Sequence, residues 1–287
     1  MGKTKVIAIE GIDGSGKSVQ YNKLAEALTD MGYSVEKREY PKYESYFGSH
    51  VGSYLSGAEG VKADTVDGKS MALWFALDRW EDMRSHIDGE YDYMIINRYV
   101  LSNAVYQSIR DIDLQRPDII DWVFDLEYGH FCLPKADIYL FYDVAPAQAG
   151  ENVMKKGFRD YVGGEKKDVY EESCGIQQRA RAKYLETAQR RNDIAVIQCM
   201  GDEGMRSIED IGAETMRVLR ERNMICPRRT TAFNIKTAPC WSICGCCCAP
   251  ILFAAGLPGR LFSYSEPFTL RRAEFGGSLF GGGAAVG

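Results

Sequence analysis

The chain has 287 residues, of which 45% are hydrophobic and 26% charged, as expected for a globular protein of one large domain or two small ones. Its net charge of −5 argues against nucleic acid as the main partner, because binding phosphates along a duplex requires a basic face. No apolar run approaches the roughly 18 residues of a membrane span and no signal peptide is recognisable, so we expect a cytoplasmic protein without membrane contact.

The first 224 residues alternate short β-rich runs with longer helical segments. The strands are predicted at residues 5–10, 33–40, 91–97, 136–144 and 193–199. The helices are predicted at residues 18–31, 66–87, 101–110, 116–128, 171–190 and 206–223. Strands that alternate with helices predict the α/β class, with a mainly parallel five-stranded sheet between two helical layers.

A glycine-rich loop follows the first strand and opens the first helix. Its sequence, GIDGSGKS, fits the pattern G-x-x-x-x-G-K-[ST]. Bare backbone lets successive N–H groups converge on phosphate oxygens, and the following helix adds its positive end. We therefore expect ATP to be held by Gly11, Gly14, Ser15, Gly16, Lys17 and Ser18, with Mg²⁺ as cofactor at the Ser18 hydroxyl. The alternative is a glycine-rich turn that matches the pattern by chance.

Three further segments narrow the function. They are ALWFALDRWE at 72–81, NRYVLSNAVYQ at 97–107, and LPKAD at 133–137, which is followed by LFYDV. With the loop IEGIDGSGKS, they resemble the thymidylate kinases, a branch of the P-loop nucleoside monophosphate kinases, over roughly residues 4–222. The resemblance implies a P-loop NTPase fold, transfer of the γ-phosphate of ATP to dTMP, and a homodimer. Two alternatives are a kinase for another deoxynucleoside monophosphate and a nucleotide-binding module with weakened catalysis.

The segment 72–81 offers a candidate base-binding site. Phe75 and Arg79 are four residues apart, so they share one helix face, where a flat ring and a guanidinium can hold a base. The resemblance implies that Phe75 stacks on thymine and that Arg79 bonds its 4-oxo group. It also implies that Asn103 reads the N3 edge and that Tyr106 crowds the 2′ position of the sugar. The alternative for Phe75 is an ordinary core residue.

The acceptor phosphate is expected at the end of the third strand, because ligands of open α/β sheets lie at the carboxyl ends of strands. Arg98 stands there, preceded by Asn97 where the family usually has aspartate. The alternative for Arg98 is an ion pair with a nearby carboxylate. The resemblance places Asp13 at the 3′-hydroxyl of the acceptor. Tyr43 could donate to the acceptor phosphate, with Lys42 as a second candidate. The residues expected at dTMP are Asp13, Tyr43, Phe75, Arg79, Arg98, Asn103, Tyr106 and Gln107.

Residues 151–170 carry several cations around a Gly-Gly pair. We expect a lid that closes over ATP, because cations around the transferred phosphoryl group lower its barrier. Arg159 is the first candidate, so the expected catalytic set is Lys17, Arg98, Arg159 and Asp13. The other expected lid cations are Lys155, Lys156, Lys166 and Lys167. The alternative is a charged face exposed to solvent.

Residues 225–287 have a different composition. They hold six of the nine cysteines, many glycines, and more lysine and arginine than aspartate and glutamate. The run CWSICGCCC lacks the separated C-x-x-C pairs of most zinc sites. We therefore expect residues 1–224 to form the catalytic domain and residues 225–287 a poorly ordered tail. A metal site or a lipidated cysteine cluster is the alternative.

Overall fold

The computed structural model describes residues 2–60, 66–155 and 166–225. The chain divides into two units, Met1–Ala232 and Phe233–Gly287, and the described residues all belong to the first. The expected poorly ordered tail falls outside the described residues, apart from Ile225. Within the described part, no helix is long and apolar enough to cross a membrane.

Five parallel strands form the central sheet, which confirms the predicted class. They are β1 (Lys5–Glu10), β2 (Val35–Glu39), β3 (Tyr93–Asn97), β4 (Ile138–Asp143) and β5 (Ile194–Gln198), in the order β2-β3-β1-β4-β5. In this register Ile9 pairs with Asn97 on β3 and with Leu140 on β4. The glycine-rich loop therefore leaves the sheet beside the residue that follows β3, Arg98.

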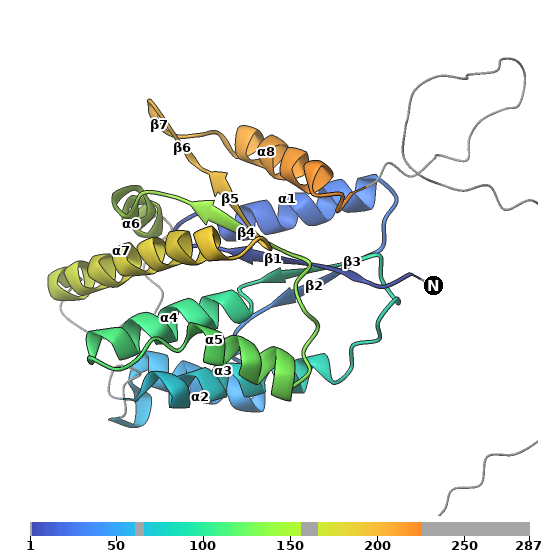
Figure 1. Ribbon diagram of the computed structural model, residues 1–287. Helices are drawn as coiled ribbons and strands as arrows, with labels where there is room; N and C mark the ends of the chain where they lie inside the picture. Colours follow the sequence, from blue (N-terminus) through green and yellow to red (C-terminus); the bar gives the residue numbers. More distant parts are fainter. Residues whose placement is uncertain (1, 61–65, 156–165, 226–287) are drawn as a thin grey trace, which may run out of the picture. The chain divides into compact units, whose positions relative to one another are not determined.

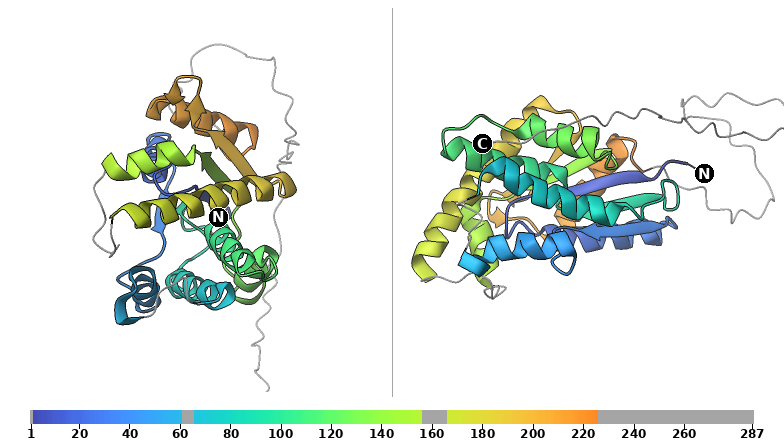
Figure 2. Two further views of the ribbon diagram at one scale, coloured as in Figure 1. Left: turned by 90° about the vertical axis from the view of Figure 1, so that its left-hand side faces the viewer. Right: turned by 90° about the horizontal axis from the view of Figure 1, so that it is seen from below.

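Helices cover both faces of the sheet (Figure 1). On one side lie α1 (Lys17–Asp30) and α8 (Ile208–Glu221). On the other lie α4 (Val100–Asp113), α5 (Ile120–Phe124) and α7 (Lys166–Arg190), with α3 (Gly68–Met83) and α2 (Tyr46–Ser56) packed successively outside α4. The left view of Figure 2 places α8 in orange and α2 in blue at opposite ends of these layers.

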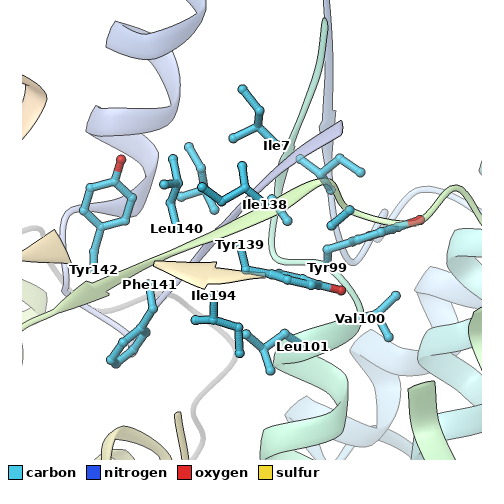
Figure 3. Close-up of a cluster of buried hydrophobic side chains, with 14 of the residues drawn as sticks. Ile7, Tyr99, Val100, Leu101, Ile138, Tyr139, Leu140, Phe141, Tyr142 and Ile194 are labelled. Atoms are coloured by element: carbon cyan, nitrogen blue, oxygen red, sulfur yellow. The ribbon is translucent and has the colours of Figure 1, made fainter. Parts of the chain in front are cut away.

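The core lies between the sheet and the helices (Figure 3). All six residues of β4 are buried, as expected for a central parallel strand that is covered on both faces. Phe141 of β4 stacks on Tyr184 of α7, with ring centroids 4.6 Å apart. This packing fixes the position of α7 against the sheet, which matters for the site described below.

Several elements were not predicted. These are α2, α6 (Pro146–Lys155), the short hairpin β6–β7 (Met200–Gly201 and Gly204–Met205), and a π-helical turn (Asp125–His130) that ends the expected helix 116–128. The sequence of α2, YFGSHVGSYLS, is poor in strong helix formers. The helix is stabilised instead by its N-cap Ser45, whose hydroxyl accepts from the Gly48 N–H at 2.9 Å.

The folded part continues past residue 224. Met224 and Ile225 are both buried, and the Met224 carbonyl accepts hydrogen bonds from Lys5 Nζ at 2.6 Å and Tyr93 Oη at 2.7 Å. These contacts attach the end of the described chain to the amino-terminal edge of β1 and β3.

Truncation can locate the end of the folded unit. We expect a chain ending at Ile225 to keep the thermal midpoint of the full chain within about 2 °C. A chain ending at Arg222 lacks two buried apolar residues, so its free energy of unfolding should fall by about 2–4 kcal/mol and its thermal midpoint by several degrees. Differential scanning calorimetry of the three chains measures this. Equal midpoints for the two truncated chains would contradict the role given to Met224 and Ile225.

Candidate active site

The glycine-rich loop has the backbone shape that its sequence predicts. Gly14 and Gly16 both have φ 81°, in the left-handed region that favours glycine. Gly16 is also the N-cap of α1 and makes no side-chain cap, so the first N–H groups of α1 can bind an anion. Lys17 is buried, and its Nζ donates to the Ile12 carbonyl at 2.7 Å inside the loop.

Gly14 packs directly against the backbone of α6. A Cβ atom at this position would lie 2.0 Å from the Ala149 carbonyl oxygen, far inside contact distance. The Asn152 side chain of α6 also donates to the Gly14 carbonyl at 2.9 Å. The loop therefore has no room for a side chain at residue 14, so that position cannot supply a cation to the phosphates.

Replacing Gly14 by alanine should destabilise the protein more than the same change at Gly32. Gly32 has φ 83° but would place its Cβ in open space, so its substitution measures backbone strain alone, about 1 kcal/mol. The additional loss in Gly14→Ala reports the clash with Ala149. Thermal unfolding of the two variants measures the difference, and equal losses would contradict the contact.

Arg98 has a strained backbone and a well-defined side chain. Its φ is 63°, and its N–H donates to the Ile9 carbonyl at 3.0 Å. The guanidinium pairs with Asp13 of the loop and lies over the Tyr106 ring, 5.6 Å from its centroid. Burial disfavours the charged form, but the Asp13 carboxylate outweighs it and the pKa of Arg98 is raised. Strain of this kind in a non-glycine residue is typical of functional positions.

Gln177 of α7 joins the loop to α4. Its Oε1 accepts from the Asp13 backbone N–H at 3.0 Å and from Tyr106 Oη at 2.9 Å, and its Nε2 donates to Asp13 Oδ2 at 3.2 Å. The sequence analysis missed Gln177. No local pattern marks it, because it lies 164 residues from Asp13.

Glu10, the last residue of β1, holds the start of α4. It is fully buried and accepts from the N–H groups of Tyr99 at 2.9 Å and Ser102 at 3.3 Å, and from Tyr184 Oη at 3.2 Å. Burial raises the pKa of this carboxyl group. Since the N-cap Tyr99 provides no side-chain cap, Glu10 takes that role from the neighbouring strand.

Two of the predicted base-binding residues lie at a second buried carboxylate. Arg79 and Asn103 both bond Glu127, a residue of the π-helical turn that the sequence analysis did not select. Phe75 is only partly buried and is absent from the hydrophobic core cluster. This placement leaves its ring accessible and disfavours the alternative of an ordinary core residue.

The segment after β2 is attached to α3 by carboxylates. The Lys42 backbone N–H donates to Asp78 at 2.9 Å, and Lys42 Nζ pairs with Asp82. This pairing argues against Lys42 as a free cation for the acceptor phosphate. Tyr43, the other candidate in this segment, is 43% exposed, and its role at the acceptor phosphate stays a prediction.

Three buried amide side chains have an oxygen without a hydrogen-bond partner among the described residues, and one of them is Asn103. The other two belong to Asn97 and Gln107, which are 3% and 2% exposed. Asn97 Nδ2 donates to Glu39 at 2.8 Å, so a carboxylate stands beside the position where the family usually has aspartate. Both amides lie where the sequence predicts a polar ligand.

Of the expected lid cations, the structure describes one side chain. Lys155 ends α6 and is exposed. Lys166 and Lys167 begin α7, but their side chains lie outside the described part, as do Lys156 and Arg159 altogether. The lid therefore remains an expectation of the sequence.

Comparison with known proteins identifies close similarities. The thymidylate kinase family profile matches residues 9–203. Thymidylate kinase of Mycobacterium tuberculosis (strain H37Rv) is 36% identical over 187 residues, which are 64% of this chain and 85% of that protein. Among solved structures, thymidylate kinase from Candida albicans aligns with a TM-score of 0.56 at 19% identity, covering 77% of this chain and 93% of its own. Thymidylate kinase from Ehrlichia chaffeensis gives 0.53 at 22%, covering 76% and 100%.

Proposed function

Because the chain belongs to the thymidylate kinase family, we propose that it transfers the γ-phosphate of ATP to dTMP and releases ADP and dTDP. The enzyme is a phosphotransferase that uses ATP as donor. The structural observation that supports this most is the pair between Asp13 and Arg98, which joins the glycine-rich loop to the start of α4. This pair supports a donor site on the loop next to an acceptor site along α4.

The reaction needs positioning and charge neutralisation more than a strong base. An oxygen of the dTMP phosphate attacks the γ-phosphorus while the bond to the β–γ bridging oxygen breaks, and ADP leaves with that electron pair. We propose that Lys17 neutralises the phosphates of ATP and that Arg98 holds the attacking phosphate in line. Asp13 positions Arg98 and faces the sugar of the acceptor. Arg159 and the other lid cations complete the charge around the transferred group.

Magnesium fits the oxygen donors at this site. The Ser18 hydroxyl is exposed in the first turn of α1, and oxygen is the ligand that Mg²⁺ prefers. The described residues contain no group of three histidine, cysteine, aspartate or glutamate side chains that could hold a metal. We propose that Ser18 and the nucleotide phosphates hold the ion, which neutralises developing charge on the phosphates. Glu39 beside Asn97 supplies a carboxylate near the position that lacks one.

A homodimer is a further part of the proposal. Aromatic side chains of α2 and α3 form a connected cluster in which Tyr46 is 66% exposed and His50 stacks on Trp74 with ring centroids 5.1 Å apart. Exposed aromatic patches are typical of protein interfaces. Sedimentation velocity measures the oligomeric state, and a monomer at micromolar concentration would contradict this assignment. The cytoplasmic location stays a prediction.

An acceptor panel tests the proposed function. Purified protein with ATP and Mg²⁺ is offered dTMP, dUMP, dCMP, dGMP and thymidine, and ADP release is measured with a coupled assay. We expect the highest kcat/KM with dTMP. A higher value with another monophosphate would identify a different acceptor, whereas tight ATP binding without turnover on any of them would indicate a binding module.

A further inference from the structure

The most deeply buried ion pair of the described residues lies away from the phosphates. Arg79 is 2% exposed and Glu127 is 0% exposed. Arg79 Nε donates to Glu127 Oε2 at 2.6 Å and Nη2 donates to Oε1 at 2.5 Å, so the pair is bidentate. This contact uses Nε and one of the two Nη2 hydrogens, and Nη1 takes no part in it.

The same carboxylate orients Asn103. Asn103 Nδ2 donates to Glu127 Oε1 at 2.8 Å and to the Ala72 carbonyl at 3.0 Å. Both partners are acceptors, so the amide must present its NH₂ group to them. Its Oδ1 is then left as a buried acceptor without a hydrogen-bond partner among the described residues. A buried polar atom of this kind is costly unless a ligand satisfies it.

We propose that Glu127 is the positioning residue that sets the base specificity of the acceptor site, an inference that rests on the proposed function. By holding Arg79 and Asn103 together, it presents a donor (Arg79 Nη1) beside an acceptor (Asn103 Oδ1). The edge of a thymine or uracil base offers the complement, an acceptor at O4 and a donor at N3–H. Cytosine offers the reverse, a donor amino group and an acceptor N3, so it meets a mismatch at both positions.

The charge of Glu127 is what makes this arrangement fixed. A neutral glutamine at residue 127 could turn its NH₂ group toward Asn103, whose amide would then reverse to accept from it. The Arg79 charge would also lose its buried partner. A π-helical turn places the carboxylate at this depth, and such turns are frequent at functional sites. Burying an ion pair rarely stabilises a fold more than apolar packing would, which favours a role in specificity.

The test compares Glu127→Gln, Glu127→Asp and Asp143→Asn with the wild type. Asp143 is the matched control, because it is also buried and forms a bidentate pair, with Arg181 at 2.5 and 2.9 Å. The readouts are kcat and KM for dTMP and dCMP, direct binding of both nucleotides by calorimetry, and thermal unfolding.

We expect the wild type to favour dTMP over dCMP by at least about 10²-fold, and Glu127→Gln to reduce that ratio by about 10- to 100-fold, mainly through the KM for dTMP. Glu127→Asp keeps the charge, so its preference for dTMP over dCMP should lie between those of Glu127→Gln and the wild type. Asp143→Asn should lower the thermal midpoint but leave the ratio within about twofold, since a lost structural pair does not change base reading. A folded Glu127→Gln variant with an unchanged ratio would overturn the proposal.

A measurement on the unmodified protein covers the case in which Glu127→Gln does not fold. The dTMP analogue methylated at N3 cannot donate to Asn103 Oδ1, so we expect its binding to be at least about 10²-fold weaker than that of dTMP. Equal binding of the two would overturn the assigned orientation of Asn103. Because these binding measurements do not require turnover, a protein that binds dTMP selectively without phosphorylating it would refute the proposed function, and the dTMP and dCMP binding ratios of the Glu127 variants would still test the role of Glu127.

Discussion

Replacing Lys17 by alanine should lower the turnover number with ATP and dTMP by about 10³-fold while the protein stays folded. The Lys17 ammonium group stands at the end of the glycine-rich loop, where it adds a localised positive charge to the backbone N–H groups. The side chain is buried and bonds the Ile12 carbonyl, so its removal should cost about 1 kcal/mol of stability. Steady-state kinetics and thermal unfolding measure the two effects separately.

Lys23→Ala is the matched control for this experiment. Lys23 lies on the same helix, is exposed, and pairs with Glu209 at 3.2 Å. Exposed pairs of this kind contribute about 1 kcal/mol or less, and Lys23 lies more than one helical turn beyond Lys17 in α1, so we expect normal turnover. A Lys17→Ala variant that turns over as fast as Lys23→Ala would refute the location of the ATP site.

Removing the Arg98 side chain should lower kcat/KM for dTMP by about 10²- to 10³-fold and change ATP binding little. The guanidinium is paired with Asp13 and can present its remaining donors to the acceptor phosphate in a planar fork. Arg98→Lys keeps a charge but loses the fork, so it should recover only part of the activity.

The backbone of Arg98 allows a second, independent test. At φ 63° alanine is disfavoured and glycine is not, so Arg98→Gly should be more stable than Arg98→Ala by about 1 kcal/mol. Both variants lack the guanidinium and should be equally impaired in turnover. This pattern would show that the backbone conformation of Arg98 costs the wild type stability, and that the guanidinium held there is needed for turnover. Equal thermal midpoints would contradict that interpretation.

The glycine-rich loop and the positions of the strands along the chain could be predicted because their signals are local. Gly14, Gly16 and Lys17 stand within four consecutive residues, and the steric need for glycine acts between neighbours in the chain. The buried strands are also visible in the sequence, because a strand that is covered on both faces is mostly apolar along its length. In β4 all six residues are buried. Helix α2 was missed because its stability comes from the Ser45 cap and from packing against α3.

By itself, then, the sequence determined the α/β class, the glycine-rich loop, and which side chains are candidates for reading dTMP. It could not determine their partners. Glu127 lies 48 residues from Arg79 and Gln177 lies 164 from Asp13, and neither stands in a distinctive pattern. Only the tertiary structure decided that these residues meet. The π-helical turn packs so that Glu127 contacts Arg79 of α3 and Asn103 of α4, and α7 packs so that Gln177 contacts the loop. Contacts between distant segments depend on the arrangement of the whole fold. Loop conformation and strand burial instead restrict which residue types can stand at consecutive positions, so they can be read from the sequence.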